Sequence, residues 1–109
     1  MLIYEVNLSV DKETAPAFAE WLKPHIKEVV RVGRFESAEW FERDPGDEGL
    51  QDKTRILWTI HYRVKDRSTL DNYLERHAPR LREDGLQKFP GKFTATRRIL
   101  ELYKPHLTR

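Results

Sequence analysis

Two segments of the chain alternate regularly between apolar and polar residues. Within residues 2–10 the apolar positions on one face are Tyr4, Val6, Leu8 and Val10. Within residues 54–64 they are Ile56, Trp58, Ile60, Tyr62 and Val64. A period of two is typical of β-strands, because successive side chains point to opposite faces of a sheet. Residues 35–43 and 92–102 are expected to form two further strands, which makes four in all.

Apolar residues at helical spacing predict a first helix after residue 10. It follows the possible N-caps Asp11 and Thr14, continues through residue 30 and should end at Gly33. Its apolar stripe consists of Phe18, Leu22, Ile26 and Val29. Because proline lacks a backbone hydrogen-bond donor, Pro24 is expected to kink or split this helix.

A second helix is predicted after residue 65. It should begin at Asp66 or Ser68, be broken or restarted by Pro79, and end at Gly85. Its apolar stripe consists of Leu70, Tyr73, Leu74, His77 and Leu81. Residues 44–49 are rich in Asp, Gly and Pro and predict a turn between the second and third strands.

The resulting order, β-α-β-β-α-β, predicts an α+β protein with a ferredoxin-like fold, formed as one domain by residues 1–109. Right-handed crossovers would place both helices on one face of a four-stranded antiparallel sheet. The first and third strands are expected to lie side by side at its centre.

The sheet face without helices would carry both apolar and polar residues, namely Ile3, Glu5, Asn7, Leu57, Thr59, His61 and Arg63. Either Arg97 or Arg98 would join them from the last strand, because the alternation there does not distinguish the two. This face could be solvated, or it could pack against the same face of a second copy in a two-fold homodimer. The mixed composition favours the homodimer.

The polar residues of this face form the first candidate site. Glu5, Asn7, His61 and Arg63 could bind an acidic or enolic molecule, with His61 transferring a proton and an arginine holding the anion. The same groups could instead form a hydrogen-bonded network that sets the register of a dimer. The sequence favours this second interpretation.

The space between the sheet and the helices is the second candidate site. Its lining would include Trp21, Trp58, Tyr62, Tyr73 and His77. In this hypothesis the candidate catalytic residues are His61, His77 and Arg97, and the candidate ligand-binding residues are Asn7, Trp58, Tyr62 and Tyr73. The alternative is an ordinary core, because aromatic residues at this spacing usually pack against one another.

Other kinds of chemistry have less support. The chain contains no cysteine, which excludes disulfides, cysteine-bound metals and a thiol nucleophile. The four histidines, His25, His61, His77 and His106, do not follow the spacing of metal ligands, so we predict no metal and no cofactor. There is no Gly-x-Ser-x-Gly motif and no glycine-rich phosphate loop.

Charge is distributed unevenly along the chain. The 20 basic and 18 acidic residues give a net charge of +2, but residues 1–54 carry −5 and residues 55–109 carry +7. RNA-recognition modules share the predicted order of elements, but they expose aromatic residues on the open sheet face, whereas Tyr4 is in phase with Val6 and Leu8. We therefore expect no nucleic-acid partner. The two halves interleave in this fold, so the imbalance favours self-association.

The sequence also bears on location. Its first residues reach Glu5 without the basic stretch of a secretory signal, and the longest apolar run, residues 56–60, is too short to cross a bilayer. We expect a cytoplasmic protein without a membrane partner.

Several short runs resemble the motifs of a known family. They are residues 3–8 (IYEVNL), 58–63 (WTIHYR), 77–80 (HAPR) and 91–93 (GKF), together with the pair Arg97 and Arg98. The chain resembles, over nearly its whole length, the bacterial family known as domain of unknown function 4286. This resemblance implies a ferredoxin-like subunit related to the dimeric α/β-barrel superfamily, which includes cofactor-free monooxygenases, isomerases, haem-handling enzymes and non-enzymatic stress proteins. It implies no particular activity, because no motif of the chain matches their active sites.

Two hypotheses for function follow. The first is a homodimeric small-molecule-binding protein or cofactor-free enzyme that uses the space between sheet and helices. The second is a non-catalytic structural or interaction protein whose polar sheet face only pairs subunits. The free volume between sheet and helices should distinguish them.

Overall fold

The computed structural model describes residues 1–105 and 107. Its strands are β1 (Leu2–Asp11), β2 (Ser37–Arg43), β3 (Arg55–Val64) and β4 (Phe93–Glu101). Its helices are α1 (Ala15–Gly33), α2 (Arg67–Arg76) and α3 (Ala78–Lys88), with a short 3-10 helix, η1 (Pro45–Glu48). This order confirms the predicted ferredoxin-like α+β fold.

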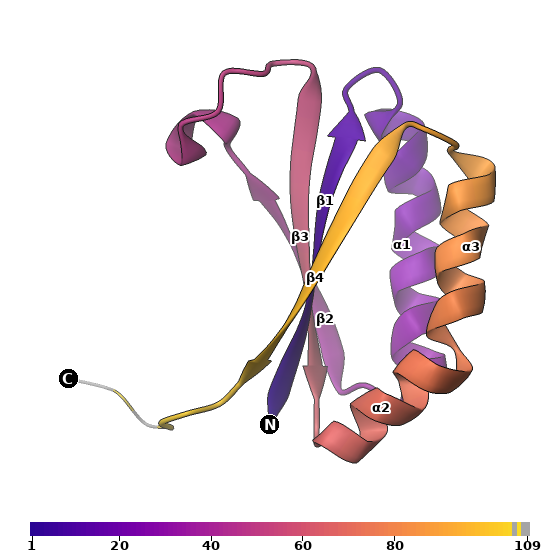
Figure 1. Ribbon diagram of the computed structural model, residues 1–109, viewed down its shortest axis with the longest axis vertical. Helices are drawn as coiled ribbons and strands as arrows, with labels where there is room; N and C mark the ends of the chain where they lie inside the picture. Colours follow the sequence, from indigo (N-terminus) through magenta and orange to yellow (C-terminus); the bar gives the residue numbers. More distant parts are fainter. Residues whose placement is uncertain (106, 108–109) are drawn as a thin grey trace.

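The four strands form one antiparallel sheet in the order β2-β3-β1-β4. The first and third strands therefore lie side by side at the centre, as predicted. Helices α1, α2 and α3 all cover the same face, and the other face carries no α-helix (Figure 1). In the register of β1 and β3, Glu5 lies opposite His61 and Asn7 lies opposite Thr59, so these polar residues share one face.

The core lies between the sheet and the helices. The predicted apolar positions Tyr4, Leu8 and Val10 of β1 are buried there, and α1 contributes the buried stripe predicted for it. Phe18 is only 1% exposed, and its ring packs against those of Trp21, Trp58, Phe89 and Phe93. Burial of these rings, together with the rest of the core, stabilises the fold.

Helix α1 ends at Gly33, where the sequence predicts, but this glycine is not the left-handed residue that terminates the helix. The left-handed residue after the helix is Arg34, with φ of 56°, and not Gly33. A Cβ atom on Gly33 would lie 2.9 Å from the ring of the buried Phe35. Glycine is therefore required here for close packing. The split expected at Pro24 is wrong, because α1 runs through that residue as a single helix.

The interruption predicted near Pro79 is confirmed, because the segment forms two helices, α2 and α3, which meet at His77. Asp66 caps α2, since its carboxylate accepts a hydrogen bond from the Thr69 amide at 2.9 Å. Pro79 lies in the first turn of α3, where its missing donor does no harm. The end predicted at Gly85 is wrong. That residue lies inside α3, and glycine allows close packing there, because a Cβ atom would lie 3.0 Å from the ring of Trp21.

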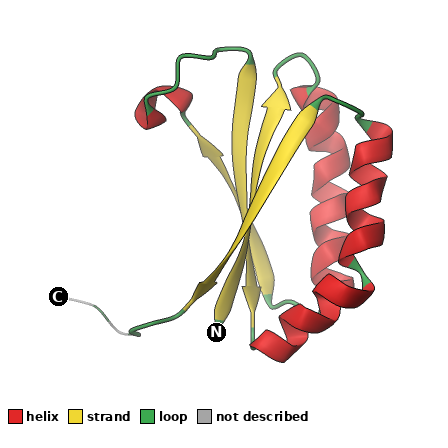
Figure 2. Cartoon of the chain, viewed as in Figure 1, coloured by secondary structure: helices red, strands yellow, loops and turns green. Residues whose placement is uncertain are grey.

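Two segments extend beyond the sheet on the side away from the helices (Figure 2). They are the β2–β3 connection, which contains η1, and the described residues after β4. Within residues 1–105, no helix is long and apolar enough to cross a membrane.

Candidate functional site

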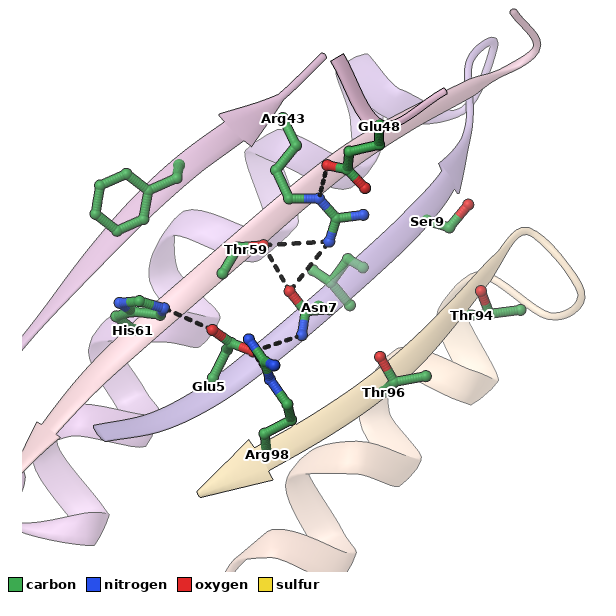
Figure 3. A pocket seen from close by; sticks show the side chains of 12 residues that line it. Glu5, Asn7, Ser9, Arg43, Glu48, Thr59, His61, Thr94, Thr96 and Arg98 are labelled. Atoms are coloured by element: carbon green, nitrogen blue, oxygen red, sulfur yellow. Dashed lines mark hydrogen bonds and ion pairs between the residues drawn. The ribbon is translucent and has the colours of Figure 1, made fainter. Parts of the chain in front are cut away.

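The uncovered face of the sheet carries a network of polar side chains centred on Glu5 (Figure 3). Glu5 is only 4% exposed. Its Oε1 atom lies 2.8 Å from Nε2 of His61, and Oε2 accepts hydrogen bonds from Nδ2 of Asn7 at 2.9 Å and from Nε of Arg98. Because an ionised carboxylate can only accept hydrogen bonds, His61 carries a proton on Nε2.

These contacts keep Glu5 ionised. The hydrogen bond from Arg98 is the largest cause of this effect; together with those from Asn7 and His61 it outweighs the opposing effect of burial and lowers the pKa of Glu5 to about 2. The structure also identifies Arg98 as the arginine of the open face, because it lies opposite Glu5 while Arg97 lies opposite Val6.

The network continues from Asn7 to the edge of the sheet. The Oδ1 atom of Asn7 accepts hydrogen bonds from Oγ1 of Thr59 at 2.6 Å and from Nη1 of Arg43 at 3.0 Å. The Nε atom of Arg43 also donates to Glu48 at 2.9 Å, and this contact connects η1 to the open face. The result is a continuous chain of contacts across β4, β1, β3 and β2.

A wide hollow of about 720 Å³ lies over this network. Besides the network, Phe41, Thr94 and Thr96 contribute to its lining. Its charged groups are balanced, because Arg98 pairs with Glu5 and Arg43 pairs with Glu48. This face can therefore hold polar groups without attracting one sign of charge.

A second, much smaller space lies between the sheet and the helices. Its volume is about 50 Å³, which is room for one or two water molecules. Most of its walls are apolar or aromatic, with Tyr4, Tyr62 and Tyr73 among them. At its edge the hydroxyl of Tyr4 accepts a hydrogen bond from Nη2 of Arg82 at 3.0 Å, and Arg97 lines the same space from β4.

Burial perturbs the titratable groups that line this cavity. It raises the pKa of Tyr62 and of Tyr73 well above that of a free phenol, with the neighbouring tyrosines adding to the effect, so both hydroxyls stay protonated. Burial also lowers the pKa of His25, which lies against Trp21 with ring centroids 4.4 Å apart. The cavity is thus lined by neutral hydrogen-bonding groups, with arginines at its edge.

The predicted site residues are divided between the two faces. Asn7 and His61 belong to the network of the open face, whereas Tyr62, Tyr73 and Arg97 line the internal cavity. The sheet separates these two groups, so they do not form one site.

Two further candidate residues, Trp58 and His77, belong neither to the network of the open face nor to the internal cavity. Trp58 is a core residue whose Nε1 donates to Glu42 at 3.2 Å, and it does not line the cavity. His77 lies at the junction of α2 and α3, against the ring of Tyr73, and does not line it either. Helical spacing had placed His77 on the apolar stripe, but the helix ends at Arg76 and a new one starts at Ala78.

Some residues of the open face and of the internal cavity were not predicted from the sequence. It did not single out Arg43 on the open face, nor Tyr4, His25 and Arg82 as groups around the cavity. The spacing of four between Trp21 and His25 was a usable signal, because residues four apart share a helix face. No comparable signal existed for Arg43, because its contacts with the strands of the open face, to Asn7 and Thr59, join residues that are distant in the sequence.

A metal centre has no counterpart in the part of the chain that the structure describes, where no three histidine, aspartate or glutamate residues cluster suitably. His106, one of the four histidines considered, lies outside the described residues.

Comparison with known proteins supports the fold. The chain is similar to SnoaB, a cofactor-independent oxygenase from Streptomyces nogalater, with a TM-score of 0.65 and 12% identity over 98% of both chains. It is also similar to a de novo designed protein with a ferredoxin fold, with a TM-score of 0.52 and 17% identity over 99% of this chain and 93% of that one. No curated protein matches the sequence. A family model matches residues 1–103, and the chain therefore belongs to the family described as "Domain of unknown function (DUF4286)".

Proposed function

We propose that this protein is a homodimer that binds a small organic molecule in the space between the sheet and the helices. The observation that carries the proposal is the lining of that space. Apolar and aromatic walls surround a few polar groups, namely the hydroxyls of Tyr62 and Tyr73, the imidazole of His25 and two arginines. An apolar pocket with a few converging polar groups is the usual composition of a ligand site.

The present volume of about 50 Å³ requires the site to open when a ligand binds. Arg82 is the group best able to open it. Its side chain is exposed, and its hydrogen bond to the Tyr4 hydroxyl crosses the edge of the cavity. A change of rotamer on an exposed arginine costs little free energy, because water replaces the lost hydrogen bond.

The fold is compatible with this use. SnoaB, which is similar to this chain in fold, is a cofactor-independent oxygenase. At 12% identity we take from it only that the fold can accommodate organic chemistry without a cofactor. Catalysis by the present chain would fall to His25 and Arg97 at the cavity, since His61 lies on the other face.

The open sheet face supports the proposed homodimer. It is the face of the sheet without α-helices, and its hollow is lined both by Phe41, which is 44% exposed, and by Glu5, which is only 4% exposed. The face carries both signs of charge, including an ion pair between Arg63 and Glu39 at 3.5 Å. A patch that contains both signs can be complementary to itself across a two-fold axis.

Ligand binding is tested by a thermal-shift screen of small metabolites followed by NMR shift mapping. A ligand that binds the native state raises the melting temperature in proportion to its occupancy. We expect the affected amides to include Tyr73 and Gly85 at the cavity. Shifts confined to Thr59 and Thr96 on the open face would contradict the proposed location, and a screen without any hit would contradict the function.

The homodimer is tested by sedimentation velocity. We expect wild-type protein at about 100 μM to sediment as a dimer and the Thr96→Glu variant as a monomer, because an unpaired charge would be buried between two sheets. Gln87→Glu on the exposed side of α3 is the control and should leave the dimer intact. A monomeric wild type would exclude this assembly.

The second hypothesis, a non-catalytic protein whose polar face only pairs subunits, is favoured by two observations. The space between the sheet and the helices, whose volume was expected to distinguish the hypotheses, is only about 50 Å³. Within the described residues, every buried side-chain nitrogen or oxygen already has a hydrogen-bond partner. A dimer in sedimentation together with a screen without hits would support this alternative.

A further inference from the structure

We infer that the ligand of the internal cavity is a small organic anion with a flat apolar body, whose acid group is held by Arg82 and Arg97. This inference rests on the proposed function and names the class of molecule that the same site would take. The two arginines reach the edge of the cavity from different elements, Arg82 from α3 and Arg97 from β4. Two guanidinium groups on separate elements can hold one carboxylate or enolate between them.

The charges of these two arginines are not neutralised by the protein. Within residues 1–105 and 107, no carboxylate forms an ion pair with either side chain. Asp84 and Glu28 act in this region without pairing with either arginine, and they only partly offset the effects of burial and of Arg97 on the pKa of His25. A net positive field therefore remains at the edge of the cavity, and it favours an anion.

On the open face, by contrast, the arginines are paired with carboxylates, although the hollow there is larger. There Arg98 is paired with Glu5, and Arg43 is paired with Glu48. A charged ligand on that face would have to break ion pairs that already exist. Of the two places, only the internal cavity has positive charge available for a ligand.

The walls of the cavity define the rest of the ligand. Tyr4 and Tyr62 stack with their ring centroids 5.8 Å apart, and Trp21 and Phe93 face the same space. Aromatic walls of this kind favour a flat ring over a branched or polar body. The hydroxyls of Tyr62 and Tyr73, which burial keeps protonated, can donate hydrogen bonds to oxygen atoms on that ring.

Arg82 would have two partners in turn. Without ligand its guanidinium donates to the Tyr4 hydroxyl at 3.0 Å. With an anion bound, the guanidinium would turn to the acid group and leave the Tyr4 hydroxyl free for the ligand. The movement of Arg82 that opens the cavity would thus also bring its positively charged guanidinium into contact with the acid group.

The inference is tested with matched pairs of aromatic acids and their neutral amides. The probes are benzoate with benzamide, indole-3-acetate with indole-3-acetamide, and 2-naphthoate with 2-naphthamide, titrated into wild-type protein and followed by NMR. We expect the acid of at least one pair to bind about tenfold more tightly than its amide, with shifts at Tyr73 and Gly85. In Arg97→Gln and Arg82→Gln we expect this ratio to fall below about threefold.

Arg76→Gln is the matched control, because Arg76 is exposed on α2 and does not line the cavity; it should keep the wild-type ratio. Equal binding of acid and amide at the cavity, or an unchanged ratio in Arg97→Gln, would overturn the inference and leave the proposed function standing. Absence of binding by all six probes and by the metabolite screen would overturn both. The ratio compares two ligands on one variant, so a partial loss of stability in that variant does not affect it.

Discussion

The helix-covered face and the uncovered face of the sheet are held together by different forces. Under the helices, Phe18 is 1% exposed and packed among other rings, and only about 50 Å³ is left empty. On the other face, Glu5 is almost as inaccessible at 4%, but ion pairs and hydrogen bonds hold it below a hollow of about 720 Å³.

The difference has consequences for how each face responds to change. Burial of apolar surface is non-directional and depends little on pH, but substitutions that remove or add volume among closely packed side chains are costly. A network of charged groups tolerates changes of volume beside an open hollow, but it depends on protonation and salt. The following substitutions separate these two behaviours.

The largest effect is expected from removing a ring under the helices. Phe18→Ala should lower the free energy of unfolding by about 3–5 kcal/mol, because it removes buried apolar surface and leaves a cavity among rigid rings. Urea denaturation measures this loss. Leu86→Ala on α3, where the side chain is 52% exposed, should change stability by less than about 0.5 kcal/mol. Similar losses for the two variants would contradict the packing described for Phe18.

The second effect concerns the charge of Glu5. Its pKa in the folded protein is about 2, below the ordinary value of 4.5, so its contribution to stability is present above pH 4.5 and is lost as the pH falls from 4.5 to 2. Glu5→Gln should therefore cost about 2 kcal/mol at pH 7, less than the full shift implies because Arg98 is largely exposed.

Urea denaturation of both proteins between pH 2 and pH 7 checks this prediction. The difference in stability between wild type and Glu5→Gln should shrink toward zero near pH 2. Glu20→Gln on the exposed side of α1 is the control for loss of a surface charge. A difference that stays constant over this range would show that the carboxylate charge does not stabilise the fold.

The smallest effect compares one added methyl group on each face. Gly33→Ala should cost about 1–2 kcal/mol, because the new atom would lie 2.9 Å from the ring of the buried Phe35. Ser9→Thr keeps the hydroxyl that accepts a hydrogen bond from Arg55 and adds its methyl group beside the open hollow. It should change stability by less than about 0.5 kcal/mol, and thermal melting distinguishes the two variants.

The two faces could be predicted from the sequence because strand geometry alone determines them. Successive side chains point to opposite sides, so the alternation around Tyr4 and around Ile60 identifies the covered face without knowledge of the pairing. The polar partners Glu5 and His61 could be placed on one face for the same reason. That they face each other depends on the register between β1 and β3, which the ferredoxin-like order predicts only approximately.

Other features could not be predicted because they depend on contacts between distant residues. Arg97 and Arg98 are identical neighbours, and only the pairing of β4 with β1 determines which one reaches Glu5. Gly33 and Gly85 were expected to end helices, as glycine often does. In the structure their role is to let Phe35 and Trp21 approach the backbone, and no local pattern in the sequence reports this.

The central position of β1 also constrains the order in which the chain can fold. Glu5 contacts His61 across 56 positions of the sequence and Arg98 across 93 positions. Closing such long loops makes folding slower than in proteins with mostly local contacts. During synthesis, β1 has no strand to pair with until β3 emerges, and its second edge stays open until β4 emerges. Phe18 of α1 likewise lacks its ring partners Trp58, Phe89 and Phe93 until those segments emerge, and apolar surface that is exposed in this way favours association with other chains.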